Sequence, residues 1–451
     1  MSTATTGLPV LAVLAFVYLF CEIAKAPKFY NVITLKNVGW ALVLFGVPLL
    51  VGAAWTHYTD IVKSNNPFGT QITSSALTAW NWGSLSQRFD YSFYRIVFWD
   101  RIFSQNLAGL LGLSIILAGL IFAVNKLIRR VIFVSIVLAI APLLIFSNLH
   151  LIHLYYQSAN VIFFIFALAV ALTDGLLGAR SKPLLGAVLC GLLGSNYLMF
   201  WHGYYQDITR VYDANNLDVA VAAALKKGVP EKDAFMAYGL DWSSTLSFLA
   251  ERKSFTVPDW FKEYSHVIET PEKYLGGKSL GAVVLCQGSG GPTPRKLIEL
   301  SNLRGWQAGK VVGCYITMPA NTVRLDTVQR INTTCEGALD SVSFDSSLAD
   351  YVEIKGWATL PGKPVSAPEH IFVTMTAPSG QMKIYESVQF PRGDVNDYLK
   401  SPKLGNAGYS RLINMSGKSG RYMIGIARLN KNVLEFCQFQ KELDVRAAAV
   451  N

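Results

Sequence analysis

The stretch VIFVSIVLAIAPLLIFS at residues 131–147 decides the fold class of this 451-residue chain. Its 17 residues include no charged side chain, so it is long and apolar enough for a helix that crosses the hydrocarbon of a bilayer. Similar segments recur on both sides of it, and the sequence therefore predicts an α-helical polytopic membrane domain of about six transmembrane helices. These are expected at 8–24, 38–55, 107–124, 131–147, 161–173 and 184–200.

Basic residues are distributed unequally around these segments. Residues 1–205 carry 12 of the 40 Lys and Arg but only 5 of the 30 Asp and Glu. Eight of the 12 lie in the loops after the first, third and fifth helices, whereas the loops 56–104 and 148–157 hold four. By the positive-inside rule these two loops, both termini and everything after residue 202 lie outside the cytoplasm. Most of the net charge of +10 thus lies beside the apolar segments, where basic residues orient helices in a membrane. We therefore expect no nucleic-acid partner.

Charged residues are absent from the centres of the predicted helices. Glu22 and Asp174 lie near helix ends. Ion-coupled transporters keep ionisable groups at mid-membrane, so a transporter is the third choice among the functions considered. The functional surface is expected on the outer face.

Residues 206–320 have the pattern of a small extracytoplasmic α/β layer, because helical and strand-like segments alternate along the chain. The strand candidates are 234–240, 281–287 and 310–318, and the helix candidates are 220–228, 241–252 and 293–304. Asp241 and Trp242 follow the first of these strands. They could touch an acceptor molecule, or Asp241 could instead be the N-cap of the next helix.

Residues 321–451 have the texture of an extracytoplasmic β-sandwich. Short alternating strands are separated by turns such as PSGQ and GKSG. The strand candidates are 351–360, 370–378, 381–390, 409–415, 421–429 and 434–440. The module has no cluster of carboxylates or histidines suited to catalysis.

Four of the six cysteines lie outside the membrane in this topology, where an oxidising compartment favours disulfides. Four cysteines allow three pairings. We favour Cys286–Cys314, between two predicted strands of one layer, and Cys335–Cys437, across the two ends of the sandwich. Cys21 and Cys190 lie within predicted spans and are expected to act as small apolar residues.

Two outward segments carry the information about function: WTHYTDIVKSNNPFGTQITSSALTAWNWGSLSQRF (55–89) and SNLHLIHLYYQSAN (147–160). Together with the helices they resemble the C-terminal half of GT-C superfamily membrane glycosyltransferases. The closest likeness is to the family 39 protein mannosyltransferases and aminoarabinose transferases. The segment AYGLDWSSTLSFLAERKSFTVPDW (237–260) and the GWATL…RGDVNDYL…NAGYSRL pattern (356–412) are similar to regions that follow the last helix in some relatives.

This resemblance implies transfer of a sugar from a polyprenyl-phosphate donor to an envelope glycan, lipid or protein at the outer face of a bacterial inner membrane. The C-terminal 250 residues would then be periplasmic. The donor is a substrate; no cofactor is expected, and whether a divalent metal takes part stays open. Membrane lipid is the other expected partner.

The chemistry needs cations for the departing lipid phosphate and a base for the acceptor. Lys63 and Arg88 are candidates for the phosphate, and His57 and Asp60 for the catalytic base. His150, His153, Tyr155 and Tyr156 could line the sugar or phosphate pocket, or the tyrosines could anchor the membrane interface. His150 and His153 lack a nearby third ligand, so no metal site is predicted.

One departure from the family matters. GT-C enzymes usually place a catalytic acid in the outward loop after their first helix, and no equivalent acid occurs here. We therefore expect an upstream half, either as a partner or as a further segment. The alternative is a non-catalytic, membrane-anchored carbohydrate-binding or assembly subunit in which the sandwich is the working part.

Overall fold

The computed structural model describes residues 34, 36, 39–40, 42–178, 182–211, 216–286, 291–320, 325–362, 364–402 and 404–445. They belong to two compact units, Met1–Ile208 and Thr209–Asn451, called here the helical unit and the strand-rich unit. The predicted span at 8–24 and Cys21 lie outside the described residues.

The helical unit consists of long apolar helices joined by short, irregular helical pieces. Its longer helices are α3 (Val47–Ser64), α7 (Leu110–Phe122), α8 (Lys126–Ile145), α10 (Ser158–Gly178) and α11 (Lys182–Phe200). The shorter ones are η2 (Leu42–Gly46), η3 (Gly69–Ile72), α4 (Thr78–Trp82), α5 (Leu85–Phe89), α6 (Tyr91–Phe93), η4 (Tyr94–Ser104), α9 (Ser147–Ile152), η5 (Leu154–Gln157), η6 (Trp201–Tyr205) and α12 (Gln206–Val211).

Among the residues that the structure describes, three helices are long and apolar enough to cross a membrane: Lys126–Ile145, Leu154–Gly175 and Lys182–Thr209. They coincide with the last three of the six predicted spans, which are confirmed to this extent. The predicted third span corresponds to Leu110–Phe122, an apolar helix of only 13 residues. The second overlaps η2 and α3, a helix that continues into the polar residues after Trp55.

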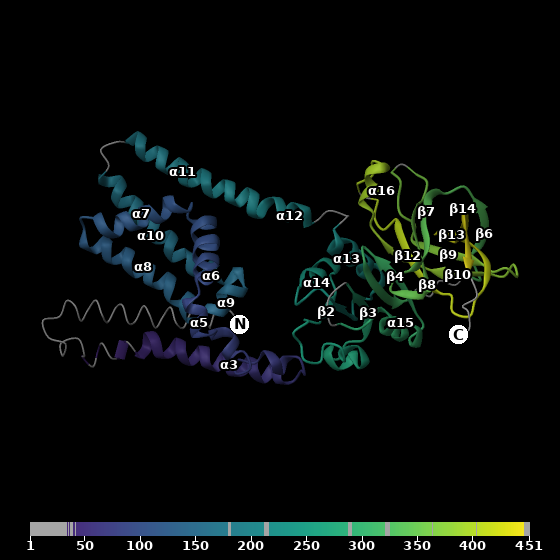
Figure 1. Ribbon diagram of the computed structural model, residues 1–451, viewed down its shortest axis with the longest axis horizontal. Coiled ribbons are helices and arrows are strands. Elements are labelled where there is room, and N and C mark those ends of the chain that lie inside the picture. Colours follow the sequence, from purple (N-terminus) through teal and green to yellow (C-terminus); the bar gives the residue numbers. More distant parts are fainter. Residues whose placement is uncertain are drawn as a thin grey trace. The chain divides into compact units, whose positions relative to one another are not determined.

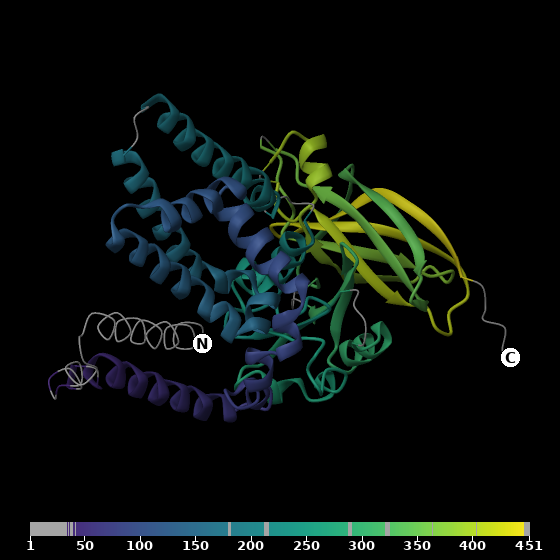
Figure 2. The same ribbon diagram turned by 60° about the vertical axis from the view of Figure 1, so that its left-hand side comes forward.

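Helices α7, α8 and α10 lie side by side and form the core of the helical unit, as Figures 1 and 2 show from two directions. Ile116, Ile132 and Phe164 from the three helices are almost fully buried among one another. Gly119 permits the close approach of α7 to α10, because a Cβ at this position would lie 2.6 Å from that of Ala171.

The strand-rich unit begins with an α/β layer. Its sheet has the strand order β2-β1-β3-β5-β4 and includes β1 (Ala234–Tyr238), β2 (Lys253–Thr256), β3 (Leu280–Leu285), β4 (Trp306–Val311) and β5 (Cys314–Pro319). The first three strands are parallel, and β4 and β5 are antiparallel additions. The helices are α13 (Leu217–Gly228), α14 (Thr245–Ala250) and α15 (Pro294–Leu303), with short η7 (Val267–Glu269) and η8 (Pro271–Tyr274).

Two local expectations for this layer were wrong. The segment 310–318 is not one strand, because Val312 and Gly313 adopt φ angles of 46° and 86° and turn the chain back as a hairpin. Asp241 is not the N-cap of the following helix. That helix starts at Thr245 with Ser244 as its N-cap, and Asp241 lies upstream with a φ of 49°.

The β-sandwich has two sheets with the strand orders β10-β9-β13-β14-β6 and β11-β12-β8-β7. The strands are β6 (Gln329–Thr333), β7 (Glu336–Asp345), β8 (Leu348–Thr359), β9 (His370–Thr376), β10 (Met382–Glu386), β11 (Val388–Phe390), β12 (Gly408–Asn414), β13 (Gly420–Asn430) and β14 (Val433–Val445), with one short helix, α16 (Gly393–Tyr398). All neighbouring pairs are antiparallel except β6 and β14.

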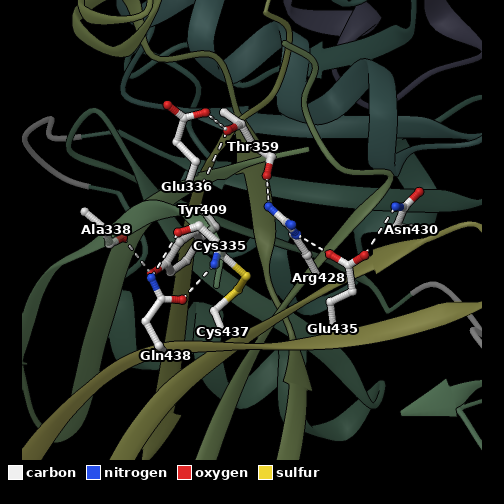
Figure 3. The surroundings of a disulfide bond; sticks show 10 residues. All are labelled: Cys335, Glu336, Ala338, Thr359, Tyr409, Arg428, Asn430, Glu435, Cys437 and Gln438. Atoms are coloured by element: carbon white, nitrogen blue, oxygen red, sulfur yellow. Dashed lines mark hydrogen bonds and ion pairs between the residues drawn. A yellow bond between two sulfur atoms is a disulfide. The ribbon is translucent and has the colours of Figure 1, made fainter. Parts of the chain in front are cut away.

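Both predicted disulfides are present. Cys286 joins Cys314 at a Cα separation of 4.1 Å, and Cys335 joins Cys437 at 5.3 Å. Figure 3 shows how Gln438 fastens the second bridge: its side-chain oxygen accepts from the backbone N–H of Cys335 at 2.7 Å, and its amide donates to the carbonyl of Cys335 at 3.1 Å. The bridge therefore joins two segments that the Gln438 side chain also links.

The α/β layer and the sandwich share one hydrophobic core. Val388 and Phe390 of β11 are buried in the same cluster as α13 and the β4–β5 hairpin. Gly309 of β4 lies so close to β12 that a Cβ would meet the carbonyl oxygen of Ser410 at 2.7 Å. Polar contacts reinforce this junction, since the buried Asp345 of β7 accepts from Lys310 and Tyr315 of the hairpin.

Candidate functional site

The two outward segments singled out in the sequence contact each other in the helical unit. Gln87 donates to the side-chain oxygen of Asn148 at 3.0 Å, and Asn148 donates to the carbonyl of Trp80 at 2.9 Å. Ser147 lies within hydrogen-bonding distance of the Gln87 side chain, at 3.1 Å, and of the Trp82 carbonyl, at 3.2 Å. Residues about 60 positions apart thus form one polar junction at the end of α8.

Arg88 holds this junction together through backbone carbonyls. Its guanidinium donates to the carbonyl oxygens of Leu144, Ser84, Trp82 and Ile145 at 2.7, 2.8, 2.6 and 2.8 Å. Four of its five N–H groups are used in this way. Arg88 therefore fixes the loop after α4 to the end of α8 and has a single N–H left for a phosphate.

Asp60 and Lys63 lie together near the end of α3. Their side chains form an ion pair at 3.4 Å, and Asp60 also accepts from the backbone N–H of Ser74 at 2.9 Å and from the Ser74 hydroxyl. Burial opposes ionisation of Asp60, but the hydrogen bonds from Ser74 and the nearby Lys63 outweigh it and lower its pKa. The carboxylate is thus ionised and fastens the following loop to α3. His57, the other candidate base, is exposed on the same helix.

A second group of polar residues is buried where α9 leads into α10. This group, called here the His150 cluster, consists of Arg101, His150, Gln157 and Asn160. Arg101 and Gln157 both donate to the carbonyl of His150 at 2.8 Å. The Asn160 amide nitrogen lies 3.5 Å from the His150 ring.

Three side-chain atoms of the His150 cluster are buried without a hydrogen-bond partner among the described residues. They are Nδ1 of His150, Oε1 of Gln157 and Oδ1 of Asn160. Burial, together with the charge of Arg101, lowers the pKa of His150 to about 4, so the ring is neutral near pH 7. Buried polar atoms are nearly always paired, and an unpaired group of three calls for an explanation. Because the Asn160 amide faces Nε2 of His150, Nδ1 carries the ring hydrogen, and the group suits a guest that both donates and accepts hydrogen bonds.

Aromatic rings gather beside the His150 cluster. The ring of His153 lies 5.4 Å from Trp80, 5.2 Å from Tyr155 and 5.7 Å from Tyr156, measured between centroids. Tyr155 is exposed, whereas Tyr156 is half-buried and lies edge-on to His150 at 6.4 Å. The structure thus brings together His150, His153, Tyr155 and Tyr156 as one group, whereas Asp60 and Lys63 contact each other and Asp60 contacts Ser74.

Sequence reasoning missed Arg101, Trp80, Gln157 and Asn160. Gln157 and Asn160 were visible as polar residues three positions apart at the start of an apolar helix, the kind of residue that marks function in a membrane segment. Arg101 had no such signal, because only the fold brings it to a residue 49 positions away.

Metal binding finds no support in this region: no group of three or more His, Cys, Asp or Glu side chains with metal-site geometry occurs among the residues that the structure covers. Comparisons with protein-family models, with characterised proteins and with solved structures find no match to this chain. Its function therefore has to be argued from its own residues.

Proposed function

We propose that the chain is a membrane glycosyltransferase of the GT-C type, or part of one, which transfers a sugar from a polyprenyl-phosphate donor to an envelope acceptor outside the cytoplasm. The observation that carries this proposal is the His150 cluster, to which the second of the two resembling segments contributes His150, Gln157 and Asn160. Its unpaired amide oxygens match the hydroxyl groups of a sugar, which donate hydrogen bonds, and the Nδ1–H of His150, whose Nε2 faces the Asn160 amide, can donate to a hydroxyl oxygen.

The surroundings of the cluster suit the two ends of such a donor. Arg101 is the half-buried cation of the cluster, where a phosphate leaving group would need charge stabilisation. The exposed ring of Tyr155 and the half-buried ring of His153 offer apolar surface with polar tips, as at a membrane interface. Arg88 acts in this proposal chiefly as a positioning residue, since it binds the carbonyl of Trp82 at the end of α4, the helix that also carries Trp80. Lys63 stays a candidate for a second phosphate contact, and Asp60 and His57 stay candidate bases.

The test is a transfer assay in membranes of the source organism, from which the gene has been deleted and then restored as wild type or variant. Radiolabelled polyprenyl-phosphate sugars serve as donors. Asn160→Leu keeps the side-chain size but removes the polar atoms, and should slow transfer by about tenfold to a hundredfold if a hydrogen bond of roughly 1.5–3 kcal/mol is lost. Arg101→Lys should also slow transfer, because lysine lacks the guanidinium fork.

The matched control is Ser158→Ala, which changes an exposed hydroxyl two positions away on the same helix. It should leave transfer unchanged. Wild-type transfer by Asn160→Leu at equal abundance would remove the His150 cluster from the site. Labelled product formed equally in the deletion strain would refute the transferase proposal and favour the non-catalytic, carbohydrate-binding alternative.

A further inference from the structure

Two Asp-Trp pairs emerge from neighbouring strands of the α/β layer. Asp241 and Trp242 follow β1, and Asp259 and Trp260 follow β2; in each case the aspartate lies three residues beyond the last strand residue. Strands β1 and β2 are parallel and in register, with Ala237 opposite Thr256. Both pairs therefore lie at the same carboxyl edge of the sheet.

The two indole rings form a corner on the surface. Their centroids are 5.7 Å apart and their planes meet at 78°. Trp242 is 53% exposed and Trp260 48% exposed, unusually high for the largest aromatic side chain. Both aspartates are exposed beside them. An apolar corner flanked by two carboxylates is thus displayed to solvent within the strand-rich unit.

The backbone beneath this corner is fixed. The N–H of Gly239 donates to the hydroxyl of Tyr264 at 3.3 Å, and Tyr264 packs edge-on against the buried ring of Tyr238. Asp241 has a left-handed φ of 49°, which a non-glycine residue adopts only at a cost that its surroundings must offset. The loop that carries Trp242 is therefore held in one conformation.

The corner lies at the ends of β1 and β2, and β1 borders the usual position for a ligand in such a sheet. The chain leaves β1 toward β2 on one side and leaves β3 toward β4 and β5 on the other, so the connections diverge between β1 and β3. Open α/β sheets bind ligands outside the carboxyl ends of the strands at such a switch point.

We propose that Trp242, Trp260, Asp241 and Asp259 form a carbohydrate-binding surface for a neutral glycan. A pyranose ring presents a face of C–H bonds, which packs on an indole, and a rim of hydroxyls, which donate to carboxylates. The two carboxylates disfavour an acidic glycan. They also disfavour docking onto an anionic bilayer, where basic residues are expected instead. This surface is independent of the His150 cluster and does not require the chain to be a transferase.

The experiment measures binding by isothermal titration calorimetry with the full chain in lipid nanodiscs. The probes are maltoheptaose, cellohexaose and mannohexaose as neutral oligomers and an oligogalacturonate as an acidic one. At least one neutral oligomer should bind, and the oligogalacturonate should bind more weakly. Trp242→Ala and Trp260→Ala should each weaken binding by about tenfold, if the lost stacking is on the order of 1 kcal/mol or slightly more. Trp242→Tyr, which keeps a ring, should lose less.

Two controls separate binding from folding. Phe248→Ala removes an exposed aromatic ring from α14 in the same layer and should bind as the wild type does. Asp241→Asn together with Asp259→Asn should reduce the preference for neutral over acidic oligomers. Asparagine is the right choice at position 241, because it tolerates the left-handed backbone that alanine would not.

The proposal is overturned if none of the three neutral oligomers binds, or if both alanine variants bind as tightly as the wild type. It is also overturned if brominated lipids in the nanodisc quench the wild-type tryptophan fluorescence more than that of the Trp242→Ala, Trp260→Ala double variant. That result would place the indole pair in the bilayer.

Discussion

The carboxylate of Asp345 joins the α/β layer to the sandwich, and its removal should loosen both. The side chain is 1% exposed and accepts three hydrogen bonds: from Lys310 Nζ at 3.0 Å, from the Tyr315 hydroxyl at 2.7 Å and from the Ser347 backbone N–H at 2.9 Å. Asp345→Asn keeps the shape but replaces one acceptor oxygen by a donor. At least one of these three donors then faces another donor.

The expected loss of stability follows from the burial of Asp345 and Lys310, which form an ion pair. Breaking a fully buried ion pair costs roughly 3–5 kcal/mol, but Lys310 is 19% exposed and water compensates part of the loss. We therefore expect the free energy of unfolding of the strand-rich unit to fall by about 2–4 kcal/mol. At roughly 2–4 °C per kcal/mol for a unit of this size, its Tm should fall by about 5–15 °C.

The pH dependence gives a second check. Burial opposes ionisation of Asp345, but the hydrogen bonds from Tyr315 and Lys310 outweigh it and lower its pKa. The stabilisation is then fully present above the unfolded-state value of about 3.9 and is lost as the pH falls through the lower folded-state value. The difference between wild type and Asp345→Asn should therefore shrink below about pH 4.

The assay is hydrogen–deuterium exchange and thermal unfolding of the full chain in detergent. Amides of β4 and β5 should exchange faster in Asp345→Asn together with those of β7, since the core is shared. In a Lys310→Met background, Asp345→Asn should lower the free energy of unfolding by about 1–2 kcal/mol less than in the wild type, because the two residues interact. Equal Tm values for wild type and Asp345→Asn, with unchanged exchange in all three strands, would refute the assignment of Asp345 as the joint.

Three further outcomes are expected. Arg88→Ala should make the loop after α4 more sensitive to protease and lower the thermal stability of the helical unit. Arg88→Lys should restore little of either property, because one ammonium group cannot reach four carbonyls. The control is Arg95→Ala, which removes an exposed arginine. Replacing Cys335 and Cys437 by serine should lower the free energy of unfolding, measured with denaturant, by up to about 4–5 kcal/mol in the chain-entropy model for a loop of 102 residues. Non-reducing peptide mapping of the wild type should find Cys286–Cys314 as the other bridge. The free energy of unfolding of the helical unit should fall by up to about 3 kcal/mol as the pH drops from about 6.5 toward 4, because the buried His150 is neutral in the folded state. An equally steep decline in His150→Gln would show that His150 does not cause this pH dependence.

Much of the fold follows from patterns that a sequence displays locally. The three confirmed spans are uninterrupted apolar runs, and most sandwich strands alternate with period two. Strand β6 was missed because its side chains, Gln329–Thr333, are mostly exposed and polar, so no buried face marks it. The hairpin at Val312 and Gly313 was hidden for the opposite reason: β4 and β5 are both largely buried, and the apolar pattern runs through the turn.

The site was predictable only in part. The sequence identified the two segments, which contact each other, and His150 of the second segment proved to be buried. It could not show that Arg88 is occupied by carbonyls of α8, since a backbone acceptor has no signature in the sequence. The exposed partner of Trp242, Trp260, was equally out of reach, because its significance depends on two parallel strands lying next to each other.

The pairing of β6 with β14 has a consequence for how the protein is made. The first strand of the sandwich has only one neighbour in its sheet, and that neighbour is the last strand, Val433–Val445. A growing chain therefore cannot complete this sheet until residue 445 has emerged, and β6 waits through the synthesis of about 100 residues with its backbone unpaired. Folding of this sheet is thus completed only after its last strand has been synthesised. Premature termination within the last strand should leave a product that quality-control proteases remove.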